Sequence, residues 1–204
     1  MKSNVINRSG LSLGVAGVIV IGLVTLVYHF TYDDIEKSEY QALLLALNSI
    51  IPEDSYDNDI VNDTRDLPAN KELGLKKDTL IYRARNKGEI FAVAFPVTAP
   101  DGYNGPIKLL LAIDRQEKIL GVRVVSHLET PGLGDRIESR RSNWLEQFRG
   151  KSTDNPTQED WKVKKDGGVF DQFTGATITP RIVIKAIHKA LIYAEAHPGV
   201  FFDE

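Results

Sequence analysis

The feature that constrains this chain most is a run of twenty residues near its start that contains no formally charged side chain. The run, Leu11 to Phe30, reads LSLGVAGVIVIGLVTLVYHF. A helix rises about 1.5 Å per residue, so a helical run of this length spans roughly 30 Å, the thickness of the hydrocarbon core of a bilayer. The sequence therefore predicts a transmembrane anchor over residues 11–30.

The charges on the two sides of this run predict its orientation. Lys2 and Arg8 precede it, whereas Asp33, Asp34 and Glu36 follow it. Basic flanks stay on the cytoplasmic side of a membrane, so we expect residues 1–10 to form a cytoplasmic N-terminus and the C-terminal domain to be periplasmic. The predicted location is the cell inner membrane, which the chain crosses once.

A cleaved signal peptide is the alternative interpretation of the same run. The apolar part of a signal peptide is shorter and ends in small residues at a cleavage site, whereas residues 27–34 read VYHFTYDD. We therefore favour an uncleaved anchor.

The composition of the chain limits its possible chemistry. The 174 residues that follow residue 30 are enough for one domain with a hydrophobic core. The absence of cysteine from the sequence excludes disulfides, thiolate nucleophiles, cysteine-held zinc and iron–sulfur clusters. The formal charge of −3 and the lack of a basic stripe argue against nucleic-acid binding. Electron or metal chemistry would have to use histidine, carboxylates or an organic cofactor.

Residues 31–78 are predicted to form a helical stalk followed by an acidic connector. Residues 33–51 have an apolar face typical of a helix, and Pro52 ends it. Residues 53–66 hold six acids against Arg65 alone. A calcium loop is not indicated, because DSYDNDIVNDTR lacks the central Gly and the final Glu of an EF-hand. We expect a solvated connector.

Residues 79–204 are predicted to form one domain built around a sheet. Two pairs of β-branched and aromatic runs, each joined by a short polar turn, indicate an antiparallel meander of about four strands. These runs are 79–85, 90–97, 107–114 and 119–128.

The rest of this domain is predicted to be mainly helical. Apolar residues at helical spacing indicate helices at Asp135–Phe148 and Pro180–His197, and a short strand is expected at Trp161–Lys165. Because strands and helices fall in separate runs, the fold class is α+β. The expected architecture is an N-terminal transmembrane helix followed by one domain with a mainly antiparallel twisted sheet flanked by helices.

The stretch DQFTGATITP, residues 171–180, is the first candidate site. Thr179 is a natural helix N-cap and Pro180 a natural first helical residue, so a helix N-terminus is expected here, where free backbone N–H groups favour a phosphate. The small Gly175 and Ala176 would let a planar group or a modifying enzyme reach the hydroxyl of Thr177. A capped helix after a glycine turn is the alternative.

Two further loops are candidates for lining a ligand. The stretch SHLETPGLGDR, residues 126–136, follows a strand, and its glycines expose backbone that can face a flat ligand. It is not a dinucleotide fingerprint, because the third glycine and the βαβ context are missing. The stretch DGYNGPI, residues 101–107, is similar in composition. Each of these loops taken alone can also be an ordinary connector.

Hydrolytic and metal chemistry are not indicated. Ser126 and His127 are adjacent on a predicted strand, so their side chains point to opposite faces and cannot form a nucleophile and base pair. His127 and Glu129 can share a face, but two ligands make an incomplete metal site. We expect a histidine that is hydrogen-bonded within the fold, no catalytic residues and no metal.

The three loops in this order behind an N-terminal anchor resemble those of the G subunits of the Rnf/Rsx electron transport complexes, which are ion-translocating oxidoreductases. The motifs in family register are DGYNGPI, HLETPGLGD, KKDGG and DQFTGATITP. This family is related to the C subunits of the sodium-pumping NADH:quinone reductases. The resemblance implies that FMN is the cofactor and that its phosphate is joined to the hydroxyl of Thr177. A flavin transferase that uses FAD and magnesium would add it.

The resemblance also implies roles for the residues around Thr177. Thr174, Gly175 and Ala176 would form the surrounding loop, and Lys165 would be a phosphate partner. Asp171 would act in loop geometry or in modification. A wall near the flavin ring would come from the stretch between residues 129 and 134, in particular Glu129, Thr130, Leu133 and Gly134.

The function implied by the resemblance is electron relay between ferredoxin and NAD, coupled to ion movement across the membrane. The partners would be the other membrane and iron–sulfur or flavin subunits of the complex, and the chain alone would have no complete catalytic activity. The alternative is a membrane-tethered periplasmic module that binds a phosphorylated ligand without a covalent bond, or that only docks partners.

Overall fold

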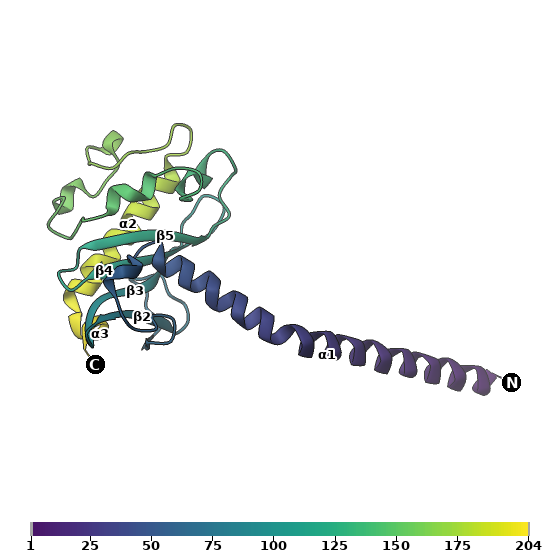
Figure 1. Cartoon of the computed structure of the whole chain (residues 1–204). Coiled ribbons are helices and arrows are strands. Elements are labelled where there is room, and N and C mark those ends of the chain that lie inside the picture. The colour runs from purple at the N-terminus through teal and green to yellow at the C-terminus, as the bar shows by residue number, and fades with distance from the viewer. Residues whose placement is uncertain (1, 204) are drawn as a thin grey trace. The chain divides into compact units, whose positions relative to one another are not determined.

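The computed structural model describes residues 2–203, with side chains for 13–32 and 34–203 (Figure 1). The chain divides into two compact units, Met1–Leu43 and Leu44–Glu204. The first consists of helix α1, Lys2–Asn48, whose last residues belong to the second unit. The second unit contains the sheet and the remaining helices.

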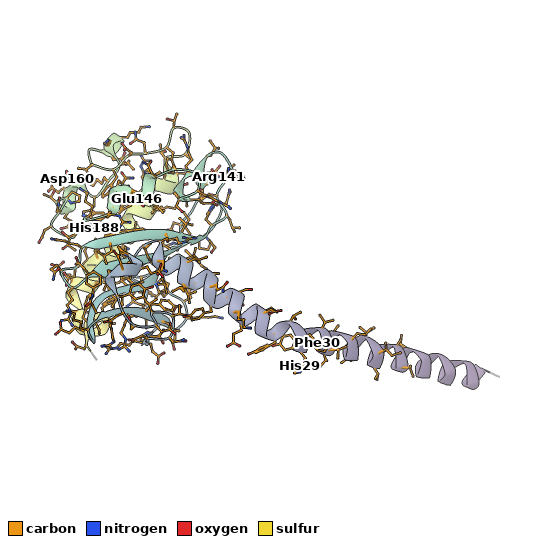
Figure 2. The ribbon with its side chains drawn as sticks, in the orientation of Figure 1. His29, Phe30, Arg141, Glu146, Asp160 and His188 are labelled. Atoms are coloured by element: carbon orange, nitrogen blue, oxygen red, sulfur yellow. The ribbon has the colours of Figure 1, made fainter. Side chains whose placement is uncertain are left out.

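Helix α1 confirms the predicted N-terminal helix. Its segment Leu13–Tyr32 has a mean hydropathy of 2.2 and is long and apolar enough to cross a membrane. His29 and Phe30 project from the surface of this helix (Figure 2). The helix continues unbroken to Asn48, because residues 23–48 contain neither proline nor glycine to interrupt it. The predicted stalk is therefore helical up to four residues before Pro52.

Five antiparallel strands form the sheet in the order β1-β2-β3-β4-β5. The four predicted strands are present and confirm the α+β class. A fifth, β1, was not predicted, and it pairs with β2 in the register Thr64↔Tyr82 to Leu67↔Thr79. The bounds are β1 Thr64–Leu67, β2 Thr79–Asn86, β3 Glu89–Ala99, β4 Ile107–Asp114 and β5 Ile119–Ser126.

Strand β1 shows that part of the acidic connector is integrated into the fold. Asp63, just before it, pairs with Arg83 at 2.6 Å and with Arg85 at 2.7 Å, both from β2. Only Leu67 of the strand is buried. A strand of four residues with one buried side chain has too little alternation to be recognised in the sequence. Its formation therefore depends on its pairing with β2.

Helix α2, Ile178–Ala196, packs its apolar face against the sheet and is followed by the short helix α3, Pro198–Phe202. The positions expected on this face are buried. They are Ile184, Ile187, Leu191 and Ala194. Phe201 of α3 packs against Phe95 of β3, with ring centroids 4.6 Å apart.

The segment predicted as one helix at Asp135–Phe148 is two short 3₁₀ helices, Gly134–Ile137 and Trp144–Phe148. Glu138 between them is extended, with φ −72° and ψ 134°. Its carboxylate bonds to His127, and the Ser142 hydroxyl donates to the Arg136 carbonyl at 2.6 Å. These bonds stabilise a turn in place of a continuous helix, while the expected apolar side chains are still buried.

The strand predicted at Trp161–Lys165 is also absent from the described structure as a continuous element. Val163 makes a single bridge to Phe170, and a 3₁₀ turn at Lys164–Asp166 ends at Gly167, whose φ is +85°. Trp161 is buried, and its ring stacks on His188, labelled in Figure 2, with centroids 4.8 Å apart. Burial destabilises the charged form of the imidazole and so lowers the pKa of His188.

Candidate functional site

The beginning of α2 differs from the predicted one by two residues. The helix starts at Ile178, and Thr177 occupies the N-cap position with φ −82° and ψ −18°. Thr179, expected as the cap, is the second helical residue and only 1% exposed. Its hydroxyl donates to Oε2 of Glu129 at 2.5 Å. As an N-cap the Thr179 oxygen would accept a bond from a backbone N–H. Here its hydroxyl instead donates a charge-assisted hydrogen bond to the buried carboxylate, so Thr179 turns inward and the helix begins before it.

The hydroxyl of Thr177 is left available by this arrangement. Thr177 is half-buried and makes no side-chain cap bond to the described part of the chain. Pro180 lies in the first helical turn, where its missing N–H costs no hydrogen bond. The remaining first-turn N–H groups and the positive end of the helix dipole therefore lie close to this hydroxyl.

A tight turn comes directly before Thr177. The N–H of Ala176 donates to the Phe173 carbonyl at 3.3 Å, and Gly175 has φ +84°, a left-handed conformation that favours glycine. Phe173 is buried, whereas Thr174 and Gly175 are exposed. The sequence TGAT thus forms an exposed turn that ends at Thr177.

Three loops meet at a cleft of about 280 Å³ beside this turn. They are the β3–β4 loop, the loop after β5 and the segment that enters α2. The Asn104 side-chain amide donates to the Thr130 hydroxyl at 3.1 Å and links the first two loops. The lining residues are Tyr103, Glu129, Thr130, Leu133, Gly134, Gly175, Ala176, Thr177, Ile178 and Thr179.

Glu129 is the buried carboxylate of this cleft. It is 6% exposed, and its Oε1 has no hydrogen-bond partner among residues 2–203. A Cβ on Gly134 would lie 2.5 Å from Oε2 and 2.9 Å from the Thr179 hydroxyl oxygen. Glycine at 134 therefore allows the loop to approach the Glu129–Thr179 pair closely.

Seven of the ten predicted site residues line the cleft, and three do not. Thr174 is at the exposed tip of the turn. Asp171 pairs with Lys164 at 2.6 Å, with both side chains more than half exposed. Lys165 is exposed, and its backbone N–H donates to Oε1 of Gln172 at 3.3 Å.

Sequence reasoning missed Tyr103, Ile178 and Thr179 as lining residues. Tyr103 is 67% exposed and lies in DGYNGPI, a loop whose composition predicted a ligand-lining segment but no particular residue. An aromatic side chain between two glycines was the available signal. For Ile178 and Thr179 the signal was weaker, because their positions depend on where the helix begins.

His127 confirms the expectation of a histidine bonded within the fold. The N–H of Glu129 donates to Nδ1 at 3.0 Å, so Nδ1 is an acceptor and the proton sits on Nε2, which donates to Oε1 of Glu138 at 2.7 Å. The imidazole thus supports the loop that carries Glu129.

The Glu138 carboxyl should titrate far below a normal glutamate. The Arg140 guanidinium and then the His127 ring donate hydrogen bonds to it and lower its pKa from 4.5 to about 2. A lowered pKa contributes stability that is present above about pH 4.5 and is lost as the pH falls toward 2. We expect Arg140→Ala to raise the pKa of Glu138, as measured by NMR titration of the carboxyl carbon.

Arg149→Ala is the matched control, because Arg149 pairs with Glu146 and not with Glu138. In the Arg149→Ala variant the Glu138 carboxyl should titrate as in the unmodified chain. A Glu138 pKa near 4.5 before any substitution would contradict the arrangement.

The cleft suits a ligand with a planar apolar part and an anionic end. Tyr103, Leu133 and Ile178 are each at least 43% exposed and offer apolar surface. The first turn of α2 offers free N–H groups to an anion. The unpartnered oxygen of Glu129 is a remaining buried acceptor. A flavin mononucleotide has both parts, so the residues present fit this group.

Comparisons with known proteins agree with this fit. Residues 102–192 match the model of the FMN-binding domain, and residues 1–50 match the model of the RnfG N-terminal region. The chain is thus an FMN-binding-domain protein with an RnfG-type N-terminal region.

Curated relatives define the family more narrowly. The G subunit of the ion-translocating oxidoreductase complex of Pseudomonas aeruginosa is 47% identical over 190 residues, which is 93% of this chain and 89% of that protein. The Vibrio cholerae G subunit of the same complex is 46% identical over 192 residues, 94% and 91% of the two chains. The crystal structure of Shewanella oneidensis NqrC aligns with a TM-score of 0.46 at 25% identity, covering 67% of this chain and 65% of that one. The chain belongs to the family of the G subunits of ion-translocating oxidoreductase complexes.

Proposed function

We propose that this chain is the membrane-anchored flavoprotein subunit of an ion-translocating oxidoreductase complex and that it carries FMN covalently on Thr177. The observation that carries the proposal is the position of the Thr177 hydroxyl. It lies in the cleft, at the head of α2, and makes no cap bond to the described residues. Gly175 and Ala176 beside it leave room for a bulky donor.

The attachment is a phosphoryl transfer to a hydroxyl. The Thr177 oxygen forms a bond to the phosphorus of the FMN half of FAD, the bond between the two phosphates breaks, AMP leaves, and the hydroxyl proton is released. A magnesium-dependent flavin transferase performs the step. First-turn N–H groups and the dipole of α2 stabilise the negative charge of the resulting phosphoester.

The bound FMN supplies the electron chemistry, and the chain's own residues hold it in place. Tyr103, Leu133 and Ile178 would pack against the ring system, and the Glu129 to Gly134 loop would form its wall. Lys165 would act on the phosphate, and Asp171 would act in loop geometry or in modification. The protein passes electrons between neighbouring iron–sulfur or flavin subunits in a path that links ferredoxin and NAD.

The membrane part of the proposal rests on α1. Its apolar segment is long enough to span a bilayer, and the basic residues before it and acidic residues after it favour a cytoplasmic N-terminus and a periplasmic domain. An uncleaved anchor would hold the flavin near the membrane subunits of the complex.

A denaturing gel tests the function directly. The full chain is produced together with a flavin transferase, and we expect flavin fluorescence in its band. Mass spectrometry should find an increment of FMN less one water on the peptide that contains Thr177. Flavin that separates on denaturation would overturn covalent attachment and favour a module for a non-covalent phosphorylated ligand. A chain without flavin would favour a docking subunit.

A further inference from the structure

The attachment turn, residues 174–178, lies between two buried residues. Phe173 before it is 5% exposed and Thr179 after it is 1% exposed. The five residues of the turn itself are exposed or half-buried. The conformation of the turn therefore depends on what holds its two ends.

The N-terminal end of the turn is held by side chains of the 3₁₀ helix Trp144–Phe148. Trp144 Nε1 donates to the Asp171 carbonyl at 2.7 Å, and the Asp171 N–H donates to Oε1 of Gln147 at 2.8 Å. The Gln147 amide donates in turn to the Trp144 carbonyl at 2.8 Å. The Trp144 ring packs on Phe173 with centroids 5.2 Å apart. Both backbone groups of Asp171 are thus bonded to side chains of this helix.

The C-terminal end of the turn is held by the Glu129–Thr179 hydrogen bond. It joins residues fifty positions apart and is fully buried. The main chain of Glu129 is bonded in turn to His127. The first turn of α2 is therefore tied to the end of β5.

We propose that Trp144 and Glu129 are positioning residues that hold the two ends of the attachment turn, so that the Thr177 hydroxyl is presented to the flavin transferase before any flavin is attached. This inference rests on the proposed function. If the turn is ordered for only part of the time, the affinity for the transferase equals the affinity of the ordered form multiplied by the fraction of time that the turn is ordered. The chemical step is unchanged.

The test compares substitutions that remove one hydrogen bond with controls that keep the hydrogen bonds at the two ends of the turn. Trp144→Phe removes the Nε1–H that bonds to Asp171. Its matched control is Trp161→Phe, because Trp161 is also buried among aromatic rings but its Nε1 has no partner in the described part of the chain. At the other end, Thr179→Val removes the hydroxyl and Thr179→Ser keeps it.

Two measurements on the full chain in detergent report how well the turn is ordered. Hydrogen exchange measured before flavin attachment should show the Ala176 amide, which donates to the Phe173 carbonyl, exchanging about two- to twelve-fold faster in Trp144→Phe and in Thr179→Val than in the unsubstituted chain, as expected from the loss of one hydrogen bond. With FAD and transferase, KM for the chain should rise in the same two variants by the factor by which the ordered fraction of the turn falls, while kcat stays the same. Trp161→Phe and Thr179→Ser should match the unmodified chain, and the melting temperature identifies any variant that fails to fold.

Unchanged exchange of the Ala176 amide in either Trp144→Phe or Thr179→Val would overturn the inference. So would a change of equal size in Trp161→Phe. If the unmodified chain accepts no flavin, the proposed function fails, but the exchange measurement still decides whether these residues hold the turn.

Discussion

Replacing Thr177 with alanine is expected to abolish covalent flavin completely while leaving the fold intact. The phosphoester needs a hydroxyl oxygen, and alanine has none. The stability cost should be small, about 0.5 kcal/mol or less, because the Thr177 side chain makes no cap bond to the described residues. In-gel fluorescence and the mass of the intact chain measure the flavin, and thermal unfolding measures the stability.

Two further variants make this result specific. Thr177→Ser keeps a hydroxyl and should retain flavin. Thr153→Ala removes a half-buried threonine that is not among the residues lining the cleft, and this variant should load like the unmodified chain. Covalent flavin that persists in Thr177→Ala would place the attachment on another residue and contradict the proposal.

Phe148→Ala should produce the largest loss of stability. Phe148 is fully buried and packs against Phe170 and Trp144, with ring centroids 4.8 Å and 5.2 Å apart. Removing a buried aromatic ring costs about 3–5 kcal/mol, because apolar contacts are lost and a cavity remains. For a domain of this size the melting temperature should fall by about 10 °C. Urea unfolding of the full chain in detergent measures the change.

The matched control is Phe202→Ala, which removes the same ring from a half-buried position in the short helix α3. Its free energy of unfolding should fall by clearly less. A loss below about 1 kcal/mol for Phe148→Ala would show that the aromatic cluster contributes little to stability. Flavin loading of Phe148→Ala should also decline, because Phe148 supports the ring of Trp144 that holds Asp171.

Most elements with a long repeating pattern could be predicted from the sequence. The apolar run of α1, the β-branched and aromatic runs of β2 to β5 and the helical spacing of α2 all extend over eight or more residues. The segment 135–148 has equally good spacing of its buried side chains, yet it forms two 3₁₀ helices. There the bond from His127 to Glu138 competes with helix formation, and no local pattern reveals it.

The candidate site also has parts that could be predicted from the sequence and parts that could not. The TGAT turn and its position before a helix could be predicted, because a left-handed glycine and a helix start depend on neighbouring residues. Tyr103 and the inward orientation of Thr179 could not. The lining of the cleft depends on loops that are adjacent only after the sheet has formed.

The sequence by itself therefore determined the apolar anchor, the α+β class and the small residues around Thr177, since these follow from composition and local spacing. Tertiary structure alone decided that β1 joins the sheet through Arg83 and Arg85, and that Glu129 bonds to Thr179 across fifty residues. A buried polar group takes the partner that the packed fold brings within reach, and that partner is not a neighbour in the chain.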